Sequence, residues 1–216
     1  MIFNDIEQRV LGVLMEKSLT QPDSYPLTLN SILLGANQKQ NRDPVREFTE
    51  REISDALRGL ERSQLVSQAP PALGARSVRF EHHAVERFHW DRREQAIMAE
   101  LFLRGRQTPG ELRTHAGRMT PFADLDAVAT TLSALRNQET PFVEELPREP
   151  GRSANRFRHL LSGPSVTPAS EKSMPAPEAR IGEDSGASDL ASRVARLEES
   201  VARLEAQMAQ WNKPEA

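Results

Sequence analysis

The sequence predicts a mainly α-helical fold with small β-hairpins, an α+β class, built from two copies of one small domain and a C-terminal coiled-coil helix. The copies are indicated by apolar residues at near-constant offsets: Ile53 precedes Val128 by 75 positions, and Phe80 precedes Phe157 by 77. Each copy follows the order helix, helix, helix, β-hairpin, which is typical of a winged helix. Each is also large enough to bury a core of its own, although only marginally. The predicted parts are winged-helix domain 1 at 1–89, winged-helix domain 2 at 90–161, a flexible linker at 162–188 and a coiled-coil helix at 189–212.

In the first copy, apolar residues at helical spacing predict a helix from about Asn4 to Lys17. Prolines interrupt the chain before a second helix, at about 28–38. A third helix begins after Thr49, because a hydroxyl followed three residues later by a glutamate forms a capping box. A strand that begins at 65–66 and a returning strand at 77–81 then flank a hairpin loop at 70–76.

The second copy repeats this order with shorter connections. The expected helices are 91–104, a short one opened by the capping box at Thr108, and 124–137. Strands at 142–146 and 155–160 form the second hairpin, or wing, with its loop at 147–154.

Near the end of the chain, apolar residues are spaced alternately four and three apart, which is the heptad pattern of a coiled coil. Valine at the a positions and leucine at the d positions favour a parallel dimer. A helix that packs on its own domain is the alternative interpretation. The residues expected to form the dimer seam are Leu190, Val194, Leu197, Val201, Leu204 and Met208.

Composition limits the classes of function. The 216 residues are 38% hydrophobic and 27% charged and include no cysteine, which excludes disulfides, thiol catalysis and cysteine-bound zinc. No apolar run has the length of a membrane span, and charges near the N-terminus argue against a signal peptide, so we expect a cytoplasmic protein without membrane contact. No spacing typical of a catalytic, cofactor or metal site is present, so we expect neither enzymatic activity nor a cofactor.

The net charge of the chain does not by itself show whether the protein binds nucleic acid. The net charge is −3, whereas domains that bind nucleic acid tightly are usually basic. Both predicted third helices begin with acidic residues, which is unfavourable for entry into a DNA groove, and a solvated face is the simpler interpretation. Any contact with DNA must therefore come from a local patch.

Two local patches qualify. The second hairpin holds Arg148, Arg152, Arg156 and Arg158, and alternation along the strand places Arg156 and Arg158 on one face with Phe157 and His159 on the other. Arginine binds phosphate well, although basic loops are also common on ordinary surfaces. The loop at 37–42 adds Lys39 and Arg42, among amides that can equally serve the loop's own backbone.

Several strings resemble the YceH family of bacterial proteins. They are Tyr25-Pro26-Leu27 with Asn30, Asn37-Gln38-Lys39, Asn41-Arg42-Asp43-Pro44-Val45, Leu103-Arg104-Gly105, Gln107-Thr108-Pro109-Gly110-Glu111-Leu112-Arg113 and Arg148-Glu149-Pro150-Gly151. The resemblance covers about residues 5–163 and continues into the heptad tail. It implies a tandem winged-helix fold, in agreement with the repeats, and it implies no activity and no catalytic or ligand residues.

Two hypotheses of function follow. The first is a non-enzymatic DNA-associated protein, such as a transcriptional regulator, that binds through the wing arginines as a homodimer. The second is a protein-interaction scaffold built on tandem winged helices, in which the acidic third helices and the apolar edges of the wings contact a protein partner.

Overall fold

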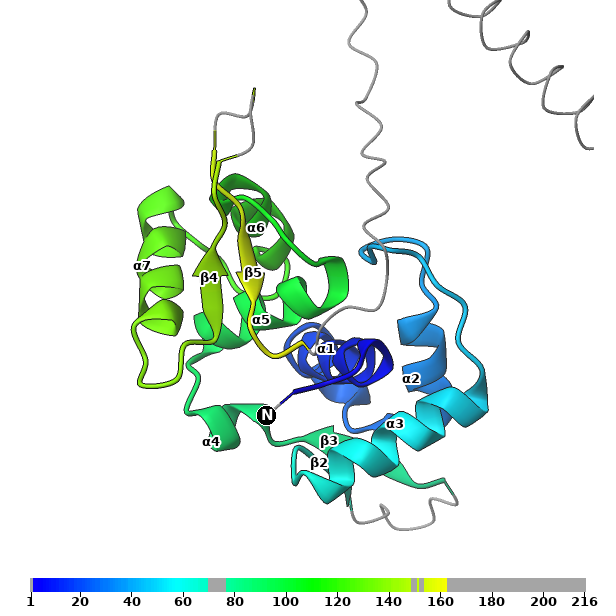
Figure 1. Cartoon of the computed structure of the whole chain (residues 1–216). Helices are drawn as coiled ribbons and strands as arrows, with labels where there is room; N and C mark the ends of the chain where they lie inside the picture. Colours follow the sequence, from blue (N-terminus) through cyan, green and yellow to red (C-terminus); the bar gives the residue numbers. More distant parts are fainter. Residues whose placement is uncertain (1, 70–76, 149–150, 152–153, 163–216) are drawn as a thin grey trace, which may run out of the picture. The chain divides into compact units, whose positions relative to one another are not determined.

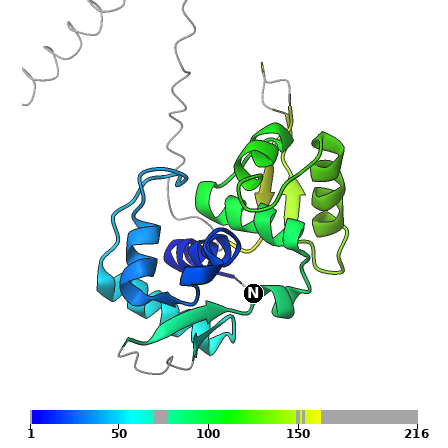
Figure 2. The ribbon, with the colours of Figure 1, turned by 180° about the vertical axis from the view of Figure 1, so that it is seen from behind.

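The computed structural model describes residues 2–69, 77–148, 151 and 154–162, which all belong to one compact unit (Figures 1 and 2). Short antiparallel sheets accompany α-helices, so the α+β class is confirmed. The predicted coiled coil lies outside the described residues, as does the predicted linker after Ser162.

The first half carries a three-stranded antiparallel sheet in the order β1-β3-β2. β1 is only two residues long and pairs Leu27 with Phe80 of β3. Both β1 and the short helix α4 are additions to the predicted order. The elements are α1 (Asp5–Thr20), η1 (Pro22–Ser24), β1 (Leu27–Thr28), α2 (Leu29–Ala36), α3 (Glu50–Arg62), β2 (Val66–Ala69), β3 (Arg79–His82) and α4 (Ala84–Phe88).

The second half repeats the same order of elements. Its strands β4 and β5 form an antiparallel pair, and a single bridge between Gln107 and Phe157 stands where β1 pairs with β3 in the first half. Thr28, the last residue of β1, and Thr108, which follows the bridge residue Gln107, each cap the next helix in their half. The elements are α5 (Arg92–Arg104), α6 (Pro109–Ala116), α7 (Leu125–Arg136), β4 (Val143–Glu145) and β5 (Phe157–His159).

Capping boxes start the helices where the sequence predicts them. Thr49 accepts a hydrogen bond from the Glu52 backbone, and the Glu52 carboxylate accepts one from the Thr49 backbone. Thr108 and Glu111 form the same reciprocal pair at the start of α6. Each box satisfies backbone N–H groups that have no partner inside the helix, so these two boundaries depend on local sequence alone.

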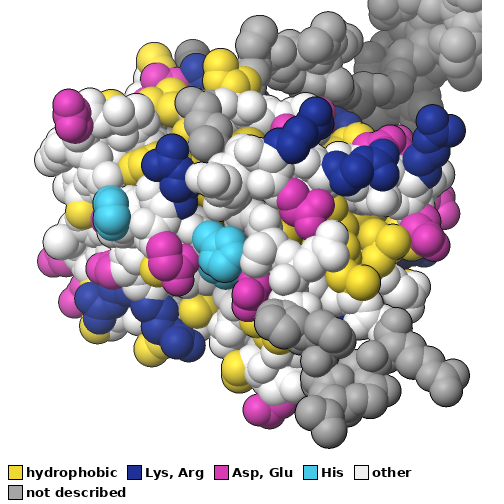
Figure 3. Space-filling model, turned by 90° about the horizontal axis from the view of Figure 1, so that it is seen from below, with side chains coloured by type: hydrophobic (Ala, Val, Ile, Leu, Met, Phe, Trp, Pro, Cys, Tyr) yellow, Lys and Arg dark blue, Asp and Glu magenta, His cyan; other side chains and the backbone are white. Residues whose placement is uncertain are grey.

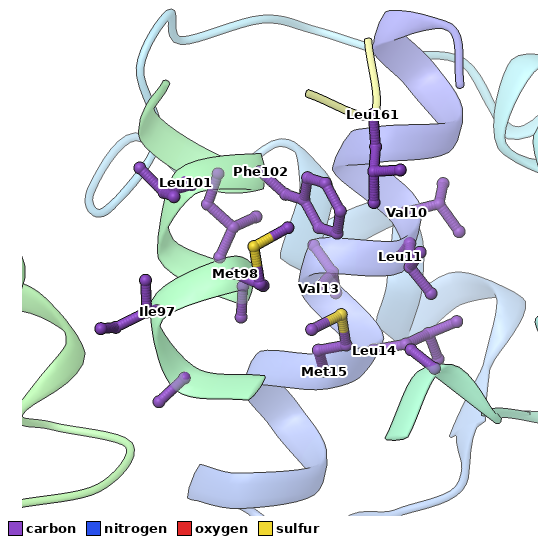
Figure 4. Packing of buried hydrophobic residues seen from close by; sticks show 14 of the residues in the cluster. Val10, Leu11, Val13, Leu14, Met15, Ile97, Met98, Leu101, Phe102 and Leu161 are labelled. Atoms are coloured by element: carbon purple, nitrogen blue, oxygen red, sulfur yellow. The ribbon is translucent and has the colours of Figure 1, made fainter. Parts of the chain in front are cut away.

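The two halves share one hydrophobic core, whereas the repeat predicts a separate core for each copy. α1 is buried along nine consecutive residues, from Gln8 to Glu16, and α5 along ten, from Glu94 to Leu103. A helix that is buried on all sides has neighbours on all sides, and each of these two helices packs against its own half and against the other. Figure 4 shows Met98 and Phe102 of α5 pointing towards α1.

The beginning and the end of the described chain meet beside this core. The backbone N–H of Phe3 donates a hydrogen bond to the carbonyl oxygen of Leu161 at 2.9 Å. The Phe3 ring packs edge-on against Phe102, which in turn packs against His159. Burial lowers the pKa of His159 to about 4, so this imidazole is neutral near pH 7 and acts as an aromatic core residue.

Because α1 and α5 pack closely, we expect that Gly12 cannot be replaced by a larger residue without loss of stability. A Cβ atom there would lie 3.0 Å from Leu103 Cδ2 and 3.0 Å from Phe102 Cβ, and overpacking in a dense core costs about 1–3 kcal/mol. We expect Gly12→Leu to lower the free energy of unfolding by about 3 kcal/mol in chemical denaturation. Gly110→Leu is the matched control, because a Cβ there meets no atom within 4 Å. Equal stability of the two variants would contradict the close contact.

Candidate functional site

The second hairpin, which carries the predicted nucleic-acid contacts, alternates cations with carboxylates. Arg158 of β5 faces Glu144 of β4 in the strand register, and its Nε donates to the Glu144 carboxylate. Arg156 lies 4.0 Å from the Glu111 carboxylate of α6. As predicted, Arg158 is exposed and the next residue, His159, is buried. The hairpin therefore exposes Arg158, whereas the side chain of Arg156 is only 21% exposed, and both have a carboxylate neighbour.

The other two arginines of this group are placed differently. Arg148 is exposed just beyond the end of β4. Arg152 lies outside the described residues.

Each third helix also carries one arginine that pairs with a carboxylate of the same chain. On α3, Arg58 contacts the Asp55 carboxylate one turn earlier. On α7, Arg136 Nη1 lies 3.0 Å from Glu145 Oε2 of β4. Figure 3, which views the molecule from the α3 side, shows cationic and acidic side chains interspersed across the surface. On the described residues of this face, cations do not gather into one continuous patch.

Arg42, a predicted nucleic-acid contact, is a buried structural residue. Its side chain is 0% exposed, and its Nη2 lies 2.5 Å from Glu16 Oε2. Its Nε donates to the Gly35 carbonyl at 2.9 Å, and its Nη1 donates to the Asn41 carbonyl at 2.7 Å. These bonds tie the loop after α2 to α1 and leave the guanidinium inaccessible to a phosphate. The prediction that Arg42 contacts nucleic acid at the surface is therefore wrong.

An ionic network that the sequence analysis missed surrounds Arg42. It joins two buried carboxylates, Glu16 of α1 and Glu100 of α5, which come from equivalent helices of the two halves. Arg118, which follows α6, reaches both: its Nη1 contacts Glu16 and its Nη2 lies 2.9 Å from Glu100 Oε2. Arg104 lies 3.7 Å from the other Glu100 oxygen.

The protonation of Glu16 follows from these partners. Burial by itself raises the pKa of Glu16, but hydrogen bonds and charge from Arg42 and Arg118 outweigh it and lower the pKa below its usual value. Glu16 is therefore ionised at neutral pH, although it is only 1% exposed.

Lys39 lies beside this network, at the surface. It is exposed in the loop after α2, where it lines an open pocket of about 420 Å³. Two elements besides this loop contribute to the lining, namely α1 and the segment after α6. The lining residues are Glu16, Lys17, Gln38, Lys39, Gln40, Asn41 and Arg118.

The described ranges contain neither a metal cluster nor a membrane-spanning helix. Among them, no group of three His, Asp or Glu side chains is placed to hold a metal ion. In the same part of the chain, no helix combines the length and apolar character needed to cross a membrane.

Comparison with known proteins agrees with the resemblance noted in the sequence. A family model described as "Protein of unknown function, DUF480" matches residues 3–152. A UPF0502 protein of Geobacter sulfurreducens is 49% identical over 180 residues, which is 83% of this chain and 81% of that protein. Another, from Shewanella amazonensis, is 39% identical over 212 residues and covers 96% of each chain.

The chain belongs to the UPF0502 family. The YceH resemblance is thereby confirmed, since YceH is a UPF0502 member. A third relative, the UPF0502 protein of Geobacter metallireducens, is 43% identical over 200 residues, 93% of this chain and 89% of that protein. Because the matches reach beyond residue 162, these UPF0502 proteins share part of the tail as well as the compact unit.

The ionic network predicts how this UPF0502 protein responds to a lost charge. Glu16→Gln leaves the buried Arg42 without its carboxylate, and breaking one side of a buried ion pair costs about 3–5 kcal/mol. We expect a loss of about that size in chemical denaturation at pH 7. Asp55→Asn, which removes an exposed carboxylate paired with Arg58, should change stability by less than about 1 kcal/mol.

We also expect Glu16→Gln to change how the stability of the protein depends on pH. A lowered pKa means that the stabilisation by Glu16 is fully present above the usual carboxyl pKa of 4.5 and is lost as pH falls through the lower, folded value. Denaturation curves of Glu16→Gln should therefore vary less below pH 5 than those of the native chain. An unchanged acid profile would contradict this assignment.

Proposed function

We propose that this UPF0502 protein is a non-enzymatic protein-interaction module built from two winged-helix units. Support for the units comes from the repeated order of helix, short paired segment, two helices and hairpin, and from the sheet order β1-β3-β2. In a winged helix the third helix, here α3 or α7, is the element that usually enters the DNA major groove, and in this proposal it is the surface that contacts a protein instead.

The observation that favours a protein partner is the pairing of the arginines. On the second hairpin, Arg158 and Arg156 each have a carboxylate neighbour, and on the third helices Arg58 and Arg136 do too. Nucleic-acid affinity depends on neutralising many phosphates, whereas these cations already face carboxylates of the same chain. These four cations therefore offer less unpaired charge to a phosphate backbone than the sequence suggests.

The exposed face of α7 suits a protein better than DNA. Leu125 is 50% exposed at the start of the helix, and Ala129 and Ala134 are exposed further along it. The charged residues Asp126 and Arg136 lie towards the two ends. Interface centres are depleted of charge and polar at the rim, so this face fits a partner protein that presents an apolar surface.

Capture of a partner tests the proposal. Leu125→Arg places a charge within the proposed contact, and burying an unpaired charge is costly, so we expect captured protein to fall at least about tenfold in a cross-linked pull-down. Leu34→Arg is the matched control, because Leu34 is also an exposed leucine, at 63%, but lies on α2. Capture should survive nuclease treatment. Loss of the captured protein with nuclease, or equal loss in both variants, would contradict the proposal.

DNA association is the second candidate, favoured by the exposure of the wing pair. The side chains of Arg158 and Glu144 are 57% and 38% exposed, and such pairs contribute little stability, so a phosphate can replace the carboxylate. Arg148, Arg152 and Arg156 lie in the same hairpin region of the sequence. Dimerisation through the heptad seam, which stays a prediction, would double these weak contacts by avidity. Either function fits a cytoplasmic protein.

A gel shift with generic duplex DNA at low salt decides this second candidate. Replacing Arg152, Arg156 and Arg158 together by alanine should weaken binding by about tenfold or more and reduce its salt dependence. The charge-matched control replaces Arg51, Arg58 and Arg62 of α3, and should bind as the native chain does. Absence of binding by the native chain, or the same binding by both variants, would rule out the wing.

A further inference from the structure

The lysines of the compact unit gather at one place. Residues 1–162 contain only two lysines, Lys17 and Lys39, and all their other permanently cationic side chains are arginines. The two lysines are 22 positions apart in the sequence, yet both line the open pocket of about 420 Å³ beside the ionic network. Arg118, from the second half, lines the same pocket.

The carboxylate in the pocket wall does not cancel these charges. Glu16 is 1% exposed, and its oxygens are already occupied by the guanidinium groups of Arg42 and Arg118. Glu100 is likewise held by Arg118, with Arg104 nearby. Three arginines thus neutralise two buried carboxylates with one charge in excess, and the ammonium groups of Lys17 and Lys39 add to that excess.

The polar groups at the pocket are also unused. Within the described part of the chain, the side chains of Lys17, Gln38, Lys39, Gln40 and Asn41 make no hydrogen bond and no ion pair. Elsewhere in this loop region, Asn37 bonds to backbone groups, and Arg42 bonds to backbone carbonyls and to Glu16. The pocket is therefore surrounded by donors that the fold itself does not need.

We propose that this pocket binds the phosphate groups of a polyanionic ligand. Lysine is a compact, mobile point charge that suits phosphate, and the amides of Gln38, Gln40 and Asn41 supply further donors for its oxygens. A volume of about 420 Å³ is within the range of small-molecule sites. The phosphate has two sources, a free polyphosphate compound or a nucleic-acid backbone, and the experiment separates them.

Lysine protection in the full chain is the first test, with inorganic tripolyphosphate as the probe. Limited acetylation, followed by peptide mass spectrometry, measures each lysine separately. We expect tripolyphosphate to slow modification of Lys17 and Lys39 at least about fivefold relative to sodium chloride at equal ionic strength. Lys172 and Lys213 are the internal reference. No protection, or equal protection of all four lysines, would overturn the proposal.

Binding by charge-matched variants is the second test. Lys39→Gln should weaken tripolyphosphate binding about tenfold in calorimetry, because it removes one charge-assisted contact. Arg51→Gln removes the same charge from α3, where Arg51 is exposed and does not line the pocket, and should change affinity less than twofold. Equal affinities of the two variants would overturn the proposal, and Lys17→Gln repeats the comparison at the second lysine.

Duplex DNA in the same protection assay identifies the source of the phosphate. Protection by duplex at a lower phosphate concentration than tripolyphosphate indicates a nucleic-acid backbone. Protection by tripolyphosphate alone indicates a small ligand. Both outcomes support the phosphate chemistry, and protection by neither would overturn it.

Discussion

The packing of α1 against α5 is the interaction on which the rest of the structure depends. These are the first helices of the two halves, and each is buried over most of its length. Their backbones approach closely because Gly12 has no side chain where Leu103 and Phe102 pass. The contact turns two small units, each marginal by itself, into one core. It also brings together the two ends of the described chain, through the bond between Phe3 and Leu161.

A consequence of this close packing is that two carboxylates, Glu16 and Glu100, are buried together in the same interface. Two like charges in a dry interface are unstable unless cations reach both, and Arg118 does so while Arg42 completes Glu16. Because Arg42 is in the loop after α2 and Arg118 follows α6, the ionic network also fixes the positions of two surface segments. The open pocket lies between those segments, so its shape is a product of the buried charges beneath it.

The parts of the fold that depend on residues close together in the sequence were predictable. The capping boxes at Thr49 and Thr108 place two helix starts, and apolar periodicity locates the remaining long helices. By contrast, β1 is too short for alternation to be visible in the sequence, and it exists because Phe80 of β3 lies opposite Leu27. The shared core and the network were missed for the same reason. Glu16 pairs with residues 26 and 102 positions away, and beside Lys17 at the end of a helix it has the pattern of an ordinary solvated charge.

The same limit explains why a charge count could not decide function. In the sequence, Arg42, Arg158 and Lys39 are equivalent cations on polar segments, but their surroundings differ. Arg42 is buried and serves the fold, Arg158 is exposed but faces Glu144, and Lys39 is exposed without an ion-pair partner among the described residues. What a cation can bind depends on whether a carboxylate of its own chain has already neutralised it. By that criterion, Lys39 at the lysine pocket is more available to an anion than Arg42 or than Arg158 of the second hairpin.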